Sequence, residues 1–304
     1  MVARQRWLSA AALLAALASG CAHDPAALGR EALARGDDRE AVRQLEHALR
    51  TDDDAALWRD LARAHQRGGD LEAAHAAIVE AAERAPEDPS VVLVRAQLRL
   101  ARDDRDGATR DALWLLDRLR DAGDLERLAI VLVRLGRADA AITAGRRAVE
   151  QSGGAADAYV NLAVLAVELR RLDVAAGVLR EGRTRHPAHV ALAESEAALL
   201  LARGDLPSAR AAYLALLPRH GRPGLVHLAL ALIDHELGEL DAALVHARAA
   251  VQAEGEGRAD VHYTLCVVLH DLGRDDEARA QLRRARRRFS AHDGLLALES
   301  TLGT

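Results

Sequence analysis

The chain has 304 residues, half of them apolar and 29% charged, a composition that supports a buried core and excludes a disordered chain. Only 2% of the residues are aromatic, and Ala, Leu and Arg are abundant, which favours helix because these side chains lose little freedom there. The formal net charge of −5 provides no overall basic field, so nucleic acid is not an expected partner.

The first twenty residues have the pattern of a secretory signal. Two arginines precede an apolar run over residues 7–18, and small residues then lead to Cys21. The run is shorter than the ~20 residues that a membrane-spanning helix needs. We therefore predict that residues 1–20 are a signal peptide that is removed, which changes the net charge from −5 to −7.

Small residues before Cys21 resemble the lipobox of bacterial lipoproteins, although Ala18 stands where that family more often has Leu. The resemblance implies that the Cys21 sulfur carries a diacylglycerol and that the mature protein begins there. Ala22 follows the cysteine, in place of the Asp that retains such proteins in the inner membrane of some Gram-negative bacteria. We therefore expect the periplasmic face of the outer membrane. The alternative is an ordinary signal with a chance cysteine near its cleavage site.

A short phrase then recurs at intervals of 33 to 35 residues: a glycine, a polar stretch that is often acidic, and an alanine five residues after the glycine. Glycine closes a helix that must reverse, and the acidic residues suit the start of the next helix. The alanine lets two antiparallel helices approach closely. The glycines are Gly36, Gly69, Gly136, Gly204, Gly238 and Gly273, and Asp103 and Arg170 occupy the two remaining positions.

This period and the residues around it resemble the tetratricopeptide repeat (TPR) family. In the second unit, for example, Trp58, Leu61 and Ala62 precede the turn and Ala81 and Pro86 follow it. The resemblance implies an all-α fold, a right-handed superhelical solenoid of about eight helical hairpins. The units are expected at 22–54, 55–88, 89–121, 122–155, 156–189, 190–223, 224–258 and 259–292, with 293–304 as a cap.

In domain terms, the lipidated N-terminus and first unit occupy 21–54, units two to eight occupy 55–292, and the cap occupies 293–304. The third unit departs most from the family pattern. Asp103 replaces the turn glycine, and Arg95 stands at an expected Leu. We therefore expect the third hairpin to be distorted.

The candidates for metal or catalytic chemistry are weak. The nearest histidine pairs are His186 with His189 and His227 with His235, and neither has the cysteine or carboxylates that complete a tetrahedral site. Cys266 stands where the repeat takes Gly or Ala, so it is expected to be buried. The catalytic G-x-S-x-G, P-loop and H-E-x-x-H patterns do not occur in the sequence. We expect no metal, no cofactor and no enzymatic activity.

The TPR resemblance implies a concave groove lined by the first helix of each hairpin. Its N-terminal half is expected to steer the acidic part of a ligand, and its C-terminal half to hold an apolar part, with Tyr263 as an anchor. The alternative is that the Val and Leu side chains pack against the adjoining helix and bind nothing. The candidates are Arg30, Arg59, Arg63 and Arg67 in the first half, and Val160, Asn161, Val164, Leu228, Leu232, Tyr263 and Val267 in the second.

The sequence therefore predicts a membrane-anchored scaffold or adaptor of the bacterial cell envelope that binds a protein or peptide partner in its groove. A pilotin-like lipoprotein that assists the assembly of one outer-membrane protein is the alternative within this class. The competing class is a metal-binding or enzymatic envelope protein that uses the scattered histidines and carboxylates.

Replacing Cys21 by Ser is expected to release the protein from membranes, because acyl chains attached there would supply the anchoring free energy, at ~0.8 kcal/mol per buried methylene. Labelling with radioactive palmitate and fractionation of the cells measure the effect. If the wild-type protein takes up no label and the variant stays with the membranes, the lipobox interpretation is wrong.

Overall fold

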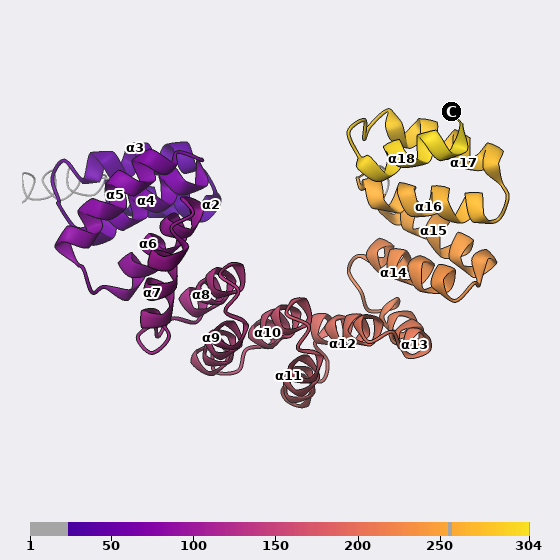
Figure 1. The fold of residues 1–304 in the computed structure, drawn as a ribbon, viewed down its shortest axis with the longest axis horizontal. Coiled ribbons are helices and arrows are strands. Elements are labelled where there is room, and N and C mark those ends of the chain that lie inside the picture. Colours follow the sequence, from indigo (N-terminus) through magenta and orange to yellow (C-terminus); the bar gives the residue numbers. More distant parts are fainter. Residues whose placement is uncertain (1–23, 255–256, 304) are drawn as a thin grey trace, which may run out of the picture. The chain divides into compact units, whose positions relative to one another are not determined.

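A computed structural model of the chain describes residues 24–254 and 257–303. Within these residues the chain forms 17 helices and no strand, which confirms the all-α prediction (Figure 1). The predicted signal peptide and Cys21 lie outside the described residues. The chain divides into two compact parts, Met1–Gln151 and Ser152–Thr304. We call these parts the first unit and the second unit, and the individual repeats hairpins.

The first unit contains four helical hairpins, and we call the first helix of each hairpin its A helix and the second its B helix. Each A helix is followed by its B helix after a short turn. The helices are α2 (Pro25–Arg35) and α3 (Asp38–Ala48), α4 (Ala55–Arg67) and α5 (Leu71–Arg84), α6 (Pro89–Ala101) and α7 (Arg105–Leu115), and α8 (Ala122–Arg134) and α9 (Ala138–Gln151).

The second unit contains four more hairpins and one terminal helix. Its helices are α10 (Ala156–Glu168) and α11 (Leu172–Arg185), α12 (Val190–Ala202) and α13 (Leu206–Leu216), α14 (Pro223–Glu236) and α15 (Leu240–Glu254), α16 (Ala259–Asp271) and α17 (Asp275–Arg286), and α18 (Asp293–Leu302). The expected repeat of helical hairpins is therefore confirmed.

The turn between A and B helices has the same backbone conformation in all eight hairpins. The residue at the recurrent position has a positive φ each time, between 58° and 85°, including the two positions that are not glycine. A positive φ admits glycine without steric penalty and strains residues with a Cβ. The recurrent glycine is therefore explained by the left-handed turn that it makes.

Alanine at the fifth position after the turn is buried in every hairpin. The side chain sits where the B helix begins to pack on its A helix, so a small residue sets how closely the two helices approach. The eight alanines, each 0% exposed, are Ala41, Ala74, Ala108, Ala141, Ala175, Ala209, Ala243 and Ala278.

Aspartate side chains cap several of the B helices, as the acidic residues after the turn predicted. Asp37, Asp70, Asp104 and Asp205 each accept a hydrogen bond from the backbone N–H three residues further on. This bond satisfies one of the amide groups that the first turn of a helix leaves without a partner.

The third hairpin is regular, so the expected distortion is wrong. Asp103 has a φ of 63° and makes the same left-handed turn as the glycines. Arg95 donates to Asp111 on the B helix, with a shortest distance of 2.8 Å, and Arg99 donates to the same carboxylate at 2.6 Å. This ion-pair cluster between α6 and α7 takes the place of the apolar contact that an A-helix Leu would make.

In the first unit each A helix contacts the next A helix, and in the second unit α10 contacts α12 and α14 contacts α16. The helix α4, for example, contacts its own B helix α5, the preceding B helix α3 and the A helices on either side, α2 and α6. Such an A helix is therefore covered in part by B helices and in part by its neighbouring A helices. Its remaining face, which we call the A-helix face, is available for contacts with other molecules.

None of the described helices is both long and apolar enough to cross a membrane.

The strained turn of the fifth hairpin gives a stability test. Arg170→Gly should stabilise the protein by about 0.5 kcal/mol, because relief of the left-handed strain exceeds the extra freedom of glycine in the unfolded chain. The matched change Gly204→Ala introduces the same strain at a turn where nothing lies near the new Cβ, and it should destabilise by about 1 kcal/mol. Urea unfolding followed by circular dichroism measures both. Equal stability of the two variants would contradict the backbone explanation.

Candidate functional site

The four arginines predicted for the first half of the groove line one cavity of about 320 Å³ between the A helices α2 and α4. Figure 1 shows the helices that carry them. We call this cavity the arginine pocket. Its lining is Arg30, Leu33 and Ala34 from α2, and Arg59, Asp60, Arg63 and Arg67 from α4.

Asp60 holds two of these arginines in place. Its side chain is only 4% exposed, and its Oδ2 accepts from Arg30 Nε at 3.1 Å while its Oδ1 accepts from Arg59 Nη2 at 2.7 Å. Arg59 also donates to Ser90 Oγ on α6 at 3.2 Å. A buried carboxylate needs such partners, so Asp60 and the two guanidinium groups form a fixed ion-pair cluster.

Arg63 lies beside this ion-pair cluster without a partner of its own. Its guanidinium makes no hydrogen bond or ion pair with any described residue, although its side chain is partly buried. Burial, and then repulsion from Arg127 on α8, lowers the pKa of Arg63 below its ordinary value, while Asp60 and Asp124 partly offset this. Arg63 stays protonated at neutral pH, so the pocket contains an unpaired positive charge.

Arg67 closes the end of the pocket. It donates from Nη1 to the backbone oxygen of Leu33 at 2.6 Å, and its Nε lies 3.1 Å from Asp38 Oδ1. The guanidinium is thus held by a backbone oxygen of the lining and by Asp38, which is outside the cavity. With Asp60 as its one acidic lining residue, the pocket keeps a surplus of positive charge that suits a carboxylate ligand.

The predicted residues of the second half lie on three A helices of the second unit. Val160, Asn161 and Val164 are on α10, Leu228 and Leu232 on α14, and Tyr263 and Val267 on α16. Three of them are well exposed apolar side chains: Val164 at 47%, Leu232 at 46% and Tyr263 at 37%. Val267, in contrast, packs partly against the buried cluster of the last repeats.

Tyr263 also has a role within the fold. Its ring lies 6.2 Å from the ring of His292, measured between centroids, and a Cβ placed on Gly294 would come within 3.0 Å of it. The start of α18 therefore covers part of the ring. The exposed remainder is what Tyr263 can offer to a partner.

The side chains of three of the histidines paired by sequence spacing have partners outside those pairs. His186 Nε2 lies 2.8 Å from the backbone oxygen of Gly154, and His235 Nε2 lies 2.6 Å from Asp271 Oδ2. His227 instead faces His246, with 3.0 Å between their Nδ1 atoms. Across the described ranges, no group of three or more His, Cys, Asp or Glu residues has a geometry that suits a metal ion.

One buried polar group was predicted from the sequence and two were missed. Cys266 is 0% exposed, as predicted, and burial raises the pKa of its thiol to about 12, which disfavours the reactive thiolate. Asp60 and Asp234, both on A helices, were missed. The available signal was an acidic residue within an apolar stripe, such as Asp60 between Leu57 and Leu61.

The sequence model of the tetratricopeptide repeat family matches residues 26–89, 126–190 and 160–224, which together make up more than half of the chain. This chain belongs to the tetratricopeptide repeat family. A search of curated proteins found no match. TPR domains are protein-interaction scaffolds that typically carry no enzymatic activity, and the architecture described above is that of such a scaffold.

Solved structures support the fold assignment. A TPR protein from Parabacteroides merdae superposes with a TM-score of 0.53 at 17% identity, covering 79% of this chain and 96% of that one. Yeast Tom70 gives 0.61 at 16% identity, covering 88% and 58%. The APC/C hetero-tetramer Cut9–Hcn1 gives 0.50 at 15% identity, covering 90% and 54%. This chain therefore spans little more than half of the last two, and identities this low establish the fold alone.

An unpaired, partly buried charge lowers the free energy of unfolding, and Arg63 allows a test of this effect. Arg63→Met should raise stability by about 1 kcal/mol, because it removes a partly buried cation that other arginines repel. Arg95→Met is the matched control and should lower stability, because Asp111 would lose one of its two cations. Thermal unfolding measures both. A loss of stability in Arg63→Met equal to that in the control would show that Arg63 has a structural partner.

Proposed function

We propose that this protein is a non-enzymatic adaptor of the bacterial cell envelope, held at a membrane by a lipid on Cys21. Its TPR units bind a protein partner on the A-helix face, and the arginine pocket receives acidic side chains or a terminal carboxylate of that partner. The envelope location and the anchor rest on the signal and lipobox pattern of the N-terminus.

The observation that carries this proposal is the unpaired cation in the arginine pocket. Asp60 already neutralises part of the charge of Arg30 and Arg59, whereas Arg63 has no partner of its own among the described residues. A carboxylate entering the cavity would remove this repulsion and gain charge-assisted hydrogen bonds. Because the neighbouring arginines are already fixed, little side-chain entropy is lost on binding.

The second unit offers a different chemistry on the same kind of face. Val164, Leu232 and Tyr263 expose apolar surface on three of its A helices. These side chains suit an apolar stretch of the partner, and Tyr263 offers the largest contact area with few rotatable bonds. One of the structurally similar proteins, Cut9–Hcn1, is itself a complex of different chains, which supports a partner-binding role for the TPR fold here.

Binding of a fluorescein-labelled hexaglutamate peptide with a free C-terminus tests the pocket. Wild-type protein should bind it with an affinity that falls as salt is added. Arg63→Glu should weaken binding about tenfold or more, because it places a carboxylate where the ligand's charge belongs. Fluorescence anisotropy at low and high salt measures both effects.

Arg110→Glu is the matched control. Arg110 is exposed on the B helix α7 of the same unit, so this change alters the net charge equally and leaves the arginine pocket intact. If both charge reversals weaken binding to the same degree, the peptide senses only the total charge of the protein, and the pocket is not the binding site.

A further inference from the structure

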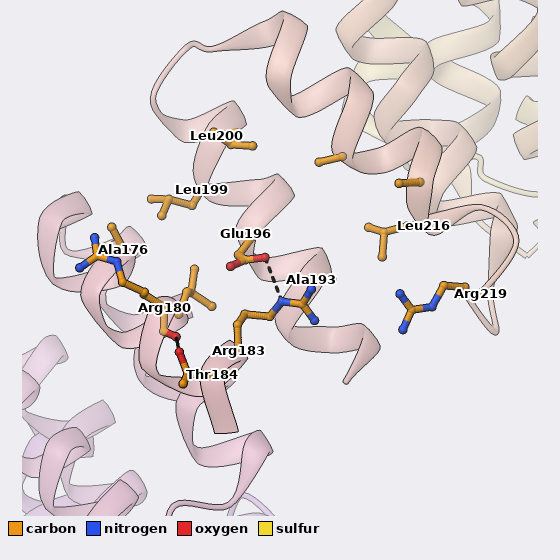
Figure 2. Close-up of a pocket in the computed structure, with 13 residues that line it drawn as sticks. Ala176, Arg180, Arg183, Thr184, Ala193, Glu196, Leu199, Leu200, Leu216 and Arg219 are labelled. Atoms are coloured by element: carbon orange, nitrogen blue, oxygen red, sulfur yellow. Dashed lines mark hydrogen bonds and ion pairs between the residues drawn. The ribbon is translucent and has the colours of Figure 1, made fainter. Parts of the chain in front are cut away.

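A second concave surface lies within the second unit, between two of its B helices. A groove of about 680 Å³ runs over α12 between the B helices α11 and α13 (Figure 2). We call it the B-helix groove. It is lined by Ala176, Leu179, Arg180, Arg183 and Thr184 from α11, Ala193, Glu196, Leu199 and Leu200 from α12, and Ala212, Ala215, Leu216 and Arg219 from α13 and the residues after it.

Small side chains create this groove. Alanines stand at four of the lining positions, Ala176, Ala193, Ala212 and Ala215, where longer side chains would fill the space between the helices. The lining leucines, among them Leu179 and Leu216, are mostly buried and form an apolar floor. The groove is therefore a surface into which apolar side chains of another molecule can fit.

Arginines stand on both walls of the groove. Figure 2 shows Arg180 and Arg183 on one side and Arg219 on the other. Arg219 donates to the backbone oxygen of Ala188 at 3.0 Å, and Arg183 donates to that of Pro187. Backbone bonds fix these two guanidinium groups, and Arg219, which has no carboxylate partner among the described residues, keeps its positive charge available to a ligand.

The charge of the groove is positive on balance. Glu196 is its one acidic lining residue, and its Oε2 lies 3.2 Å from Arg183 Nε. Arg180 is exposed, and its side chain makes no hydrogen bond or ion pair with any described residue. An occupant therefore needs apolar groups for the floor and carboxylates for Arg180 and Arg219.

We propose that the B-helix groove binds an amphipathic helix of a protein partner, with apolar side chains on one face and acidic side chains flanking them. A helix laid in a groove inserts side chains that are three and four residues apart. The residues with which α11, and α13 and its following turn, line the groove have the same spacing. This surface lies in the second unit and the arginine pocket in the first, so the two sites share no residue. The protein would then hold two partner segments at once.

The concave form and apolar floor favour a protein segment over an anionic membrane. A bilayer surface presents charge over a broad area and would not fill a recess of about 680 Å³. Nucleic acid would need aromatic or polar groups for its bases, and the floor is made of leucine and alanine. Both alternatives remain as outcomes of the test below.

The probe is a fluorescein-labelled peptide of about four helical turns, with Leu on one face and Glu on the flanking positions. Wild-type protein should bind it measurably more tightly than the same peptide with Lys in place of Glu. Arg180→Glu should weaken binding about tenfold by placing like charges together. Ala215→Trp should weaken it by about as much, because the indole fills the groove from an exposed position that tolerates a larger side chain.

Matched controls separate this site from other surfaces of the protein and from overall charge. Arg283→Glu makes the same charge change on another B helix of the unit, and Ala198→Trp adds an indole outside the groove. Both should bind the Leu/Glu peptide like the wild type. Circular dichroism should show unchanged helix content in every variant.

Three results would overturn the proposal. One is the absence of saturable binding to wild-type protein, and another is equal binding of the Leu/Glu and Leu/Lys peptides. The third is binding of the wild-type protein to phosphatidylglycerol vesicles or to single-stranded DNA, if Arg180→Glu abolishes this binding and leaves peptide binding unchanged. None of these results bears on the hexaglutamate test of the arginine pocket, so the two proposals can fail separately.

Discussion

The left-handed turn between the A and B helices is the constraint on which the rest of the structure depends. Only with a positive φ at this residue does the chain reverse quickly enough to bring a B helix back onto its A helix. The alanine five residues later then meets the A helix at a fixed position. The same geometry recurs in all eight hairpins. Each candidate binding surface lies between helices of neighbouring hairpins, the arginine pocket in the first unit and the B-helix groove in the second.

Much of the fold could be predicted from the sequence because its determinants are local. Within each hairpin a few residues hold the turn residue, the aspartate cap and the buried alanine. Their spacing can therefore be recognised in the sequence alone. The third hairpin shows where this reasoning fails. Arg95 looked like a defect at an apolar position, but Asp111 on the facing helix neutralises it. A sequence shows each residue of such a pair, and the pairing itself depends on packing between helices that the spacing does not reveal.

The candidate sites were predicted unevenly for the same reason. Arg30, Arg59, Arg63 and Arg67 follow from helical projection, because residues at this spacing share one helix face, and they do line one cavity. The distribution of charge within that cavity did not follow, since it depends on the buried Asp60. The B-helix groove was not anticipated at all. Its alanines look like ordinary helix-packing residues in the sequence. The recess exists because these short side chains leave space between helices, and the sequence does not show which helices face each other there.

The contrast between local and overall charge bears on how selective these surfaces can be. The protein is acidic overall, with a formal net charge of −5, so an acidic partner is repelled by most of its surface. The arginine pocket and the B-helix groove are local exceptions, and in both some guanidinium groups are held in place while one stays unpaired: Arg63 in the first and Arg180 in the second. Attraction at these places and repulsion elsewhere favour one docking position over many. The apolar side chains beside each cation would then distinguish a matching partner from any other acidic chain, because a purely acidic ligand leaves that surface in contact with water.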